Sequence, residues 1–128
     1  MANWRWLDSR LAQALHAEQL AEHGGAAGIR DTGLLTSALS RPQNLASYGN
    51  PDVADLAAAH AWGIVRNHPF VDGNKRVALI LCETFLIING YELDADDVSL
   101  TMAFVELAAG TTDETALAEW VRARVRRV

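Results

Sequence analysis

The chain has 128 residues, of which 50% are hydrophobic and 21% charged, and its formal net charge is −5. One domain with a continuous core fits this size, and the acidic balance argues against a dedicated nucleic-acid-binding protein. A single cysteine, Cys82, rules out an internal disulfide and favours a reducing compartment, where we expect a buried, inert thiol. We recognise no signal peptide and no apolar run of the ~20 residues that cross a membrane. We therefore expect one domain over residues 1–128 in a cytoplasmic chain, with no direct contact with nucleic acid or membrane.

The first predicted element is an amphipathic helix over residues 1–23. Apolar residues recur there at helical spacing, and Gly24 and Gly25 end the pattern. No residue near His16 or His23 has the spacing of a metal ligand, so we interpret both as solvated helix residues.

A turn-rich connector follows over residues 26–33. Asp31 is a suitable N-cap for a short helix over residues 32–40. Two interpretations of Arg30 stay open: a structural pair or cap with Asp31 that holds the connector, or a phosphate contact that reaches a functional site.

Residues 41–50 predict a loop, because they contain Pro42 and several turn-forming residues. Asn50-Pro51 then predicts a helix start, with an N-cap residue followed by proline at the first helical position. The helix carries one apolar stripe that includes His60. A histidine on such a stripe is more typical of a hydrogen-bonded core residue than of a metal ligand.

The segment that dominates the chain is residues 68–76, His-Pro-Phe-Val-Asp-Gly-Asn-Lys-Arg. Pro69 disfavours the α conformation in the residue before it, so the preceding helix is expected to end at residue 67. Asp72-Gly73 is typical of a turn, and a new helix is expected from Asn74. The pattern predicts a short polar loop that leads directly into a helix N-terminus.

This loop combines the groups that a phosphoryl or nucleotidyl transfer requires. Lys75 and Arg76 fall in the first helical turn, where the macrodipole is already positive and disfavours cations. A bound anion resolves that conflict, which indicates a phosphate site. His68 is a candidate general base near neutral pH, and Asp72 is a carboxylate suited to Mg²⁺.

The remaining residues predict further helices. Residues 74–89 are apolar nearly all round, which is typical of a helix buried in a bundle. Residues 91–93 predict a short extended piece, residues 97–108 another helix, and a last helix is expected to include Val125. The whole pattern predicts an all-α fold, a compact bundle of about six helices around a buried central helix.

Residues 68–76 resemble the signature loop of the Fic/Doc superfamily, and Lys75 resembles the Doc branch, the "death on curing" toxins of bacterial toxin–antitoxin pairs. The resemblance extends over residues 15–120 and implies the Fic/Doc fold. Its flanking matches are Gly28-Ile29-Arg30-Asp31, Gly33-Leu34-Leu35, Ser37-Ala38-Leu39, Arg41-Pro42-Gln43 and Asn89-Gly90-Tyr91.

The resemblance implies a role for each residue of the loop. His68 corresponds to the general base that deprotonates a target hydroxyl, and Asp72 to the residue that binds Mg²⁺. Phe70 corresponds to the anchor that fixes the loop in the core. The residues expected to bind the nucleotide, ATP, are Gly73, Asn74, Lys75 and Arg76.

The resemblance also implies an activity and partners. Most Fic proteins have glycine at the position of Lys75 and transfer AMP, whereas Doc-like proteins carry lysine and transfer the γ-phosphate. The implied protein is a kinase toxin that uses Mg²⁺-ATP to phosphorylate a hydroxyl of elongation factor Tu, that of a threonine by the same resemblance, and so blocks translation. A cognate, Phd-like antitoxin would silence it. Two alternatives stay open: a Fic-type AMP transferase and a catalytically silent Fic-fold binding module.

The resemblance also implies a flap that holds the target peptide beside the nucleotide. A plain surface connection is the alternative for this segment. The residues of the segment are Gln43, Asn44, Leu45, Ala46, Ser47 and Tyr48.

Overall fold

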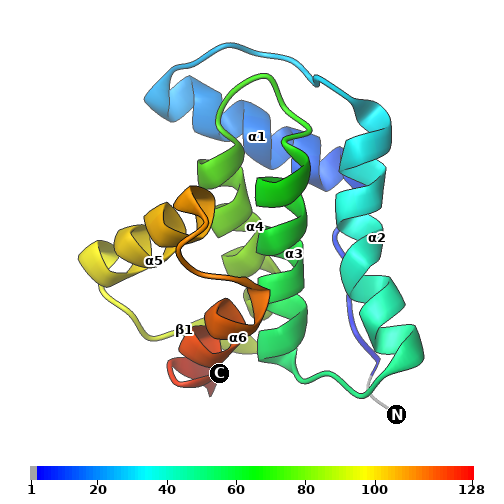
Figure 1. Ribbon diagram of the computed structural model, residues 1–128, viewed down its shortest axis with the longest axis vertical. Coiled ribbons are helices and arrows are strands. Elements are labelled where there is room, and N and C mark those ends of the chain that lie inside the picture. The colour runs from blue at the N-terminus through cyan, green and yellow to red at the C-terminus, as the bar shows by residue number, and fades with distance from the viewer. Residues whose placement is uncertain (1–2) are drawn as a thin grey trace.

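A computed structural model describes residues 3–128, and helices make up most of it (Figure 1). The expectation of about six helices is confirmed for these residues, with one small two-stranded sheet added. None of these helices is both long and apolar enough to cross a membrane. The elements are α1 (Ser9–His23), α2 (Thr32–Tyr48), α3 (Val53–Asn67), α4 (Asn74–Ile88), β1 (Tyr91–Leu93), α5 (Asp97–Ala109), α6 (Glu114–Arg122) and β2 (Val125–Arg127).

Helix α3 shares the centre of the bundle with α4, where the sequence led us to expect α4 alone. It packs against α2, α4 and α6, and a run of small residues from Ala57 to Ala59 is fully buried. Small side chains let the neighbouring backbones come close: a Cβ atom at Gly63 would lie 2.9 Å from the carbonyl oxygen of Ala38 on α2. The α2–α3 pair is therefore in near-backbone contact.

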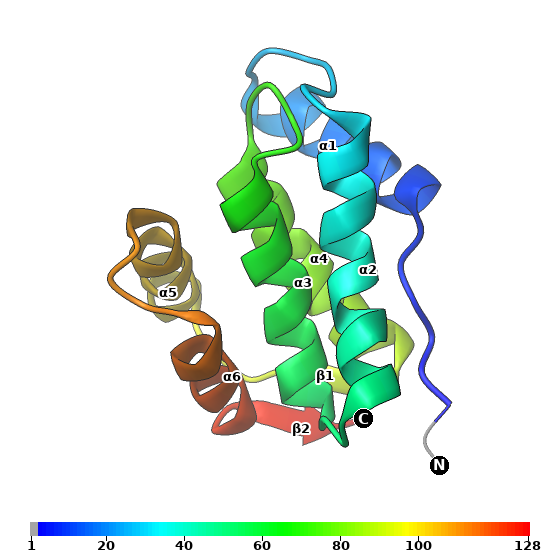
Figure 2. The same ribbon diagram turned by 45° about the vertical axis from the view of Figure 1, so that its right-hand side comes forward.

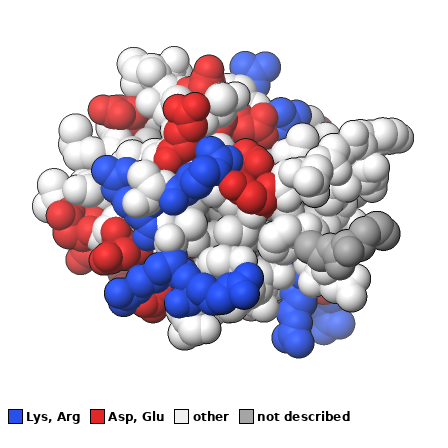
Figure 3. Space-filling model, turned by 90° about the horizontal axis from the view of Figure 1, so that it is seen from below, with Lys and Arg blue, Asp and Glu red and all other residues white. Residues whose placement is uncertain are grey.

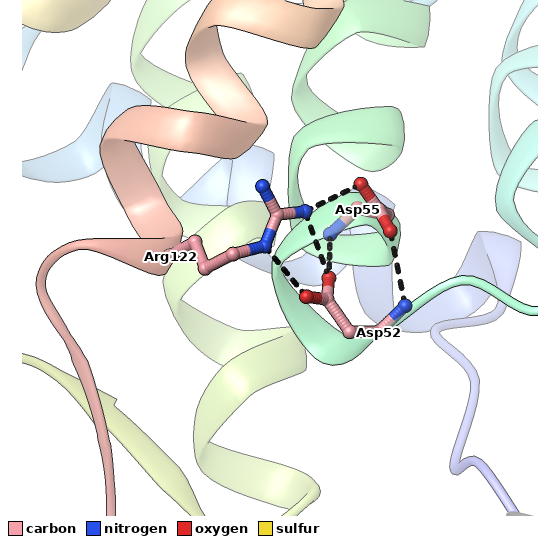
Figure 4. Close-up of polar contacts among 3 residues, drawn as sticks. All are labelled: Asp52, Asp55 and Arg122. Carbon is pink, nitrogen blue, oxygen red and sulfur yellow. Dashed lines mark hydrogen bonds and ion pairs between the residues drawn. The ribbon is translucent and has the colours of Figure 1, made fainter.

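The N-terminus of α3 is fixed by a capping box and an ion-pair network (Figure 4). Asp52 accepts from the backbone N–H of Asp55, and Asp55 accepts in return from the N–H of Asp52. Arg122 of α6 donates to both carboxylates. The helix thus begins at Val53, two positions beyond the predicted Asn50-Pro51 start, because Asp52 offers a cap with a reciprocal partner.

The expected helix over residues 1–23 is shorter than predicted. Helix α1 begins at Ser9, with Asp8 as its N-cap. The segment before it is extended and packs Trp4 and Trp6 near the ring of Phe85, with centroids 6.1 and 5.7 Å away. Both indoles are partly buried against the core, so this segment is held by packing rather than by helical hydrogen bonds. Residues 1 and 2 lie outside the described part of the chain.

The predicted loop over residues 41–50 is wrong, because α2 continues to Tyr48 with Pro42 inside it. Proline removes one helical hydrogen bond, but Pro42 continues the buried face of Leu35, Ala38 and Leu39. Tertiary burial therefore outweighs the local preference. Figure 2 shows α2 running alongside α3 and ending at the opposite end of the molecule from the loop between α3 and α4.

The C-terminal part of the chain closes the lower end of the bundle. The extended piece predicted at residues 91–93 is confirmed as β1, which pairs antiparallel with β2, Tyr91 opposite Arg127. Val125 therefore lies in a strand, not in the last helix as expected, because α6 already ends at Arg122. Basic and acidic side chains lie next to one another at this end (Figure 3), and ion pairs such as Arg126–Glu92 join the elements.

Candidate functional site

The loop between α3 and α4 has the boundaries that the sequence predicts. Helix α3 ends at Asn67, and His68 caps it in the left-handed conformation, with φ 48° and ψ 56°. Helix α4 begins at Asn74 after Gly73, also left-handed, and no side chain caps its N-terminus. Its first amide groups therefore face the loop without a side-chain partner, as an anion site requires.

This loop borders a cavity of about 660 Å³. His68, Asp72, Lys75 and Arg76 all line it and are exposed. The C-terminal end of α1 and Ala108 of α5 complete its wall. The structure thus brings the candidate base, the candidate metal ligand and both cations to one cavity.

Asn74 braces the loop from inside. Its side chain is buried, its Oδ1 accepts from the N–H of Phe70 at 3.1 Å, and its Nδ2 donates to the Phe70 carbonyl at 3.0 Å. Nδ2 also approaches Nδ1 of His68 at 3.3 Å. With these contacts the amide side chain of Asn74 is committed to the loop backbone.

Phe70 is only 1% exposed, as the expected anchor must be. Its ring stacks on His16 of α1 with centroids 3.9 Å apart. The backbone of Phe70 also forms a bridge with Ile29 in the connector between α1 and α2. In Figures 1 and 2 this connector lies beside the α3–α4 loop. The loop is therefore held by its side chain and by its main chain.

Arg30 has the structural role that one of the two interpretations gave it, but its partners differ from the expected Asp31. Its guanidinium donates to the carbonyl oxygens of His68 and Asn67, at 2.7 and 2.8 Å. Asp31, its expected partner, instead caps α2 by accepting from the N–H of Leu34. Arg30 thus provides hydrogen-bond donors for the free carbonyl groups at the end of α3. It also fixes the backbone of His68, the candidate base.

The carboxylate of Asp72 suits a metal ion that arrives with a phosphate ligand. Oδ1 accepts from the N–H of Gly73 at 2.8 Å and Oδ2 from that of Ala26 at 3.2 Å, which leaves lone pairs on both oxygens. Among residues 3–128 no three His, Cys, Asp or Glu side chains are grouped to hold a metal by themselves. Mg²⁺ commonly takes one or two carboxylates plus substrate phosphates, so this donor set fits Mg²⁺ bound together with a nucleotide.

His16 is the residue that the sequence interpretation missed. The imidazole expected in solvent is 5% exposed, and its Nε2 lies 2.7 Å from the Asp72 carbonyl oxygen. A signal was present: Ala12, His16 and Leu20 follow each other at intervals of four, which places them on one helical face. That face is turned toward the loop.

The residues proposed as a flap do not join the cavity around His68. Gln43 to Tyr48 form the last turns of α2, and Tyr48 is 92% exposed. Several of them line a different groove of about 570 Å³ between α2 and α3. The segment is helical rather than a loop, and its role as a flap that holds a target peptide stays a prediction.

Two buried titratable groups lie away from the cavity. His60 donates from Nδ1 to the Leu56 carbonyl at 2.8 Å, which confirms the expected core histidine. Burial lowers its pKa to about 4. Burial also raises the pKa of the Cys82 thiol to about 12, so this thiol is protonated and inert.

Comparison with known proteins decides the family. The model of the Fic/DOC family matches residues 6–86, which is more than half of the 128 residues. The chain belongs to the Fic/DOC family. The matched range contains the His68 loop and the elements that brace it, including His16 and Arg30.

Two curated Fic/DOC relatives carry the Doc name. The chain is 49% identical over 76 residues to "Toxin Doc" of Mycolicibacterium smegmatis, a match that covers 57% of this chain and 58% of that relative. It is 30% identical over 110 residues to "Protein kinase doc" of Escherichia phage P1, covering 85% and 86% of the two chains. The match to the first relative thus spans less than two thirds of its length.

Among solved structures, the chain is similar to the N-terminal Fic domain of a Bartonella quintana cell filamentation protein with bound ADP. The identity is 18%, the TM-score is 0.46, and the similarity covers 73% of this chain and 48% of that one.

Proposed function

We propose that this Fic/DOC protein is the toxin of a toxin–antitoxin pair and transfers the γ-phosphate of Mg²⁺-ATP to a hydroxyl group of elongation factor Tu. One observation carries the proposal: an exposed histidine, a carboxylate and two cations line one cavity at the uncapped N-terminus of α4. The names of the two curated relatives, a toxin and a protein kinase, support it.

The transfer step assigns a separate task to each group. His68 takes the proton of the target hydroxyl, whose oxygen then attacks the γ-phosphorus. The bond from phosphorus to the β–γ bridging oxygen breaks, and ADP leaves with that electron pair. Arg76, Lys75 and the free amides of α4 stabilise the negative charge on the phosphates. Asp72 would hold Mg²⁺, which neutralises phosphate charge when bound.

Lys75 favours phosphate over AMP transfer in this proposal. Its cationic side chain occupies the first turn of α4 at the edge of the cavity. There it would set which end of the nucleotide faces the target hydroxyl. The choice of elongation factor Tu and of a separate, Phd-like antitoxin rests on the resemblance to Doc.

The test is the intact mass of purified elongation factor Tu after incubation with the protein and Mg²⁺-ATP. A gain of about 80 Da, one phosphate, is expected, and His68→Ala should abolish it. A gain the size of AMP would replace the kinase by an AMP transferase. No mass change, with growth arrest retained on expression, would remove elongation factor Tu as the target. No mass change and no growth arrest would favour a silent binding module.

A further inference from the structure

His16 is a buried imidazole to which the proposed chemistry gives no role. Its ring stacks on Phe70 with the planes inclined by only 11°, and its Nε2 lies 2.7 Å from the backbone oxygen of Asp72. A carbonyl oxygen only accepts hydrogen bonds, so Nε2 carries the proton and donates it. Stacking on Phe70 therefore fixes the plane of the imidazole, and the hydrogen bond to Asp72 fixes the direction of its Nε2–H group.

This hydrogen bond fixes the peptide group between Asp72 and Gly73. In a trans peptide the C=O and N–H bonds point to opposite sides, so the N–H of Gly73 points away from His16. There it donates to Oδ1 of Asp72 at 2.8 Å. One rigid peptide group thus links the imidazole to the orientation of the carboxylate.

The connector after α1 holds the second carboxylate oxygen. The N–H of Ala26 donates to Oδ2 of Asp72 at 3.2 Å. A Cβ atom at Gly25 would lie only 2.9 Å from the same oxygen, and the φ of Gly25 is 123°, so a larger residue here would displace the carboxylate and strain the backbone. Helix α1 therefore holds the Asp72–Gly73 peptide group, and the connector after it holds one oxygen of the Asp72 carboxylate.

We propose that His16 is a positioning residue that fixes the Asp72–Gly73 peptide and so presents the Asp72 carboxylate to Mg²⁺ bound with the nucleotide. The inference rests on the proposed function, because it concerns the same cavity. Groups that orient a metal ligand without touching the metal typically change metal affinity about 10–100-fold when removed. An effect of this kind is expected on the Mg²⁺ requirement, and a smaller one on binding of the nucleotide alone.

The experiment compares three variants of the full chain. His16→Phe keeps a ring to stack on Phe70 but removes the donor, whereas His16→Gln restores an N–H donor. His60→Phe is the matched control, because His60 is the other histidine in the described chain whose ring is packed in the core, and it contacts Leu56 and Phe85 rather than the loop. The measurement is the Mg²⁺ concentration for half-maximal binding of a non-hydrolysable ATP analogue, by calorimetry, with the melting temperature of each variant.

The expected result is a rise of about 10-fold in this Mg²⁺ concentration for His16→Phe, with His16→Gln close to the wild type and His60→Phe unchanged. Equal Mg²⁺ requirements in His16→Phe and His60→Phe would overturn the positioning role. If His16→Phe does not fold, His16→Met, which also lacks a donor, takes its place under the same criteria.

A separate readout distinguishes failure of this inference from failure of the proposed function. If the wild type binds no Mg²⁺-nucleotide, the proposed function fails. The amide NMR signal of Gly73 then still tests the positioning: it should move in His16→Phe and return in His16→Gln. A Gly73 signal that is identical in all the variants would overturn the inference.

Discussion

The Nε–H of Arg30 donates to the carbonyl oxygen of His68 across 2.7 Å. This contact joins the connector after α1 to the backbone of His68, the candidate base. A second donor of the same guanidinium binds the carbonyl oxygen of Asn67 at 2.8 Å, so the planar fork spans the last two carbonyls of the α3 terminus. The position of His68 therefore depends on an arginine 38 residues earlier in the chain.

Replacing Arg30 by alanine should lower both stability and transfer activity. The variant loses two charge-assisted hydrogen bonds, and we expect a loss of about 1–2 kcal/mol in the free energy of unfolding. Activity should fall by at least about 10-fold, because His68 is no longer held. Urea denaturation and transfer assays measure the two effects. Arg10→Ala, which removes the same charge from the exposed face of α1, is the control, and equal behaviour of the two variants would contradict the role of Arg30.

Two substitutions at His68 should separate its chemistry from its backbone strain. Both His68→Ala and His68→Gly remove the imidazole and should abolish transfer. The left-handed backbone of His68 disfavours any residue with a Cβ atom by about 1 kcal/mol, so the glycine variant should be the more stable of the two by about that amount. Thermal denaturation of the pair measures the difference. An alanine variant as stable as the glycine variant would argue against strain at this position.

Lys75→Gly tests the choice between phosphate and AMP transfer. Removing the cation from the first turn of α4 should move the product from a phosphorylated toward an AMP-modified target, because Lys75 is proposed to set the nucleotide orientation. The intact mass of the target distinguishes the two products. Unchanged product chemistry would remove Lys75 from that role, and Arg76→Ala, which should lower the yield of either product, serves as the comparison.

Acid should destabilise the protein through His60. Burial lowers the pKa of His60 from 6.5 to about 4, so between these pH values the unfolded chain binds a proton that the folded protein does not. The contribution of His60 to the free energy of unfolding is therefore fully present above pH 6.5 and is lost as the pH falls toward 4. The loss at pH 5 is about 2 kcal/mol. Urea denaturation at pH 7.5 and pH 5 measures this loss. His60→Phe should lose much less over the same interval, and an equal loss would assign the effect to other groups.

Two substitutions at Asp52 should separate its contribution to helix capping from its contribution to the ion pair with Arg122. The hydrogen bond from Arg122 lowers the pKa of Asp52 to about 2. Asp52→Asn keeps an oxygen that caps α3 and should lose about 0.5 kcal/mol, because the pair is largely solvated. Asp52→Ala also loses the cap and should lose about 1–2 kcal/mol. Added salt should reduce the loss that comes from the ion pair and leave the loss that comes from the cap unchanged. Urea denaturation at two salt concentrations measures both.

Local rules located the ends of the loop correctly. Pro69 marks the end of α3, and the change from turn residues to a continuous apolar pattern marks the start of α4 at Asn74. These features depend on neighbouring residues, and so the sequence alone is sufficient. The burial of Phe70 could also be expected, because the resemblance to the Fic/Doc loop assigns it to the core.

Features that depend on tertiary packing could not be predicted in this way. The burial of Pro42 against the core extends α2 through a segment whose local composition favours a loop. The pairing of β2 with β1 removes Val125 from helical structure. His16 and Arg30 reach the loop through contacts that only the assembled fold creates, so their roles were not evident from spacing alone.

The hydrogen bonds that shape the α3–α4 loop join residues 38, 46 and 56 positions apart. Contacts this distant form late in folding, after the cost of closing the intervening chain has been met. During synthesis, a chain that extends to the end of α4 therefore contains the whole nine-residue signature. The candidate site still forms only when α1 and its connector pack against the loop. The same dependence works in reverse, since local opening of the connector would switch the site off while the rest of the bundle stays folded. The proposed activity therefore requires the whole folded domain, and we expect the nine-residue signature to be inactive on another helix pair that lacks these distant contacts.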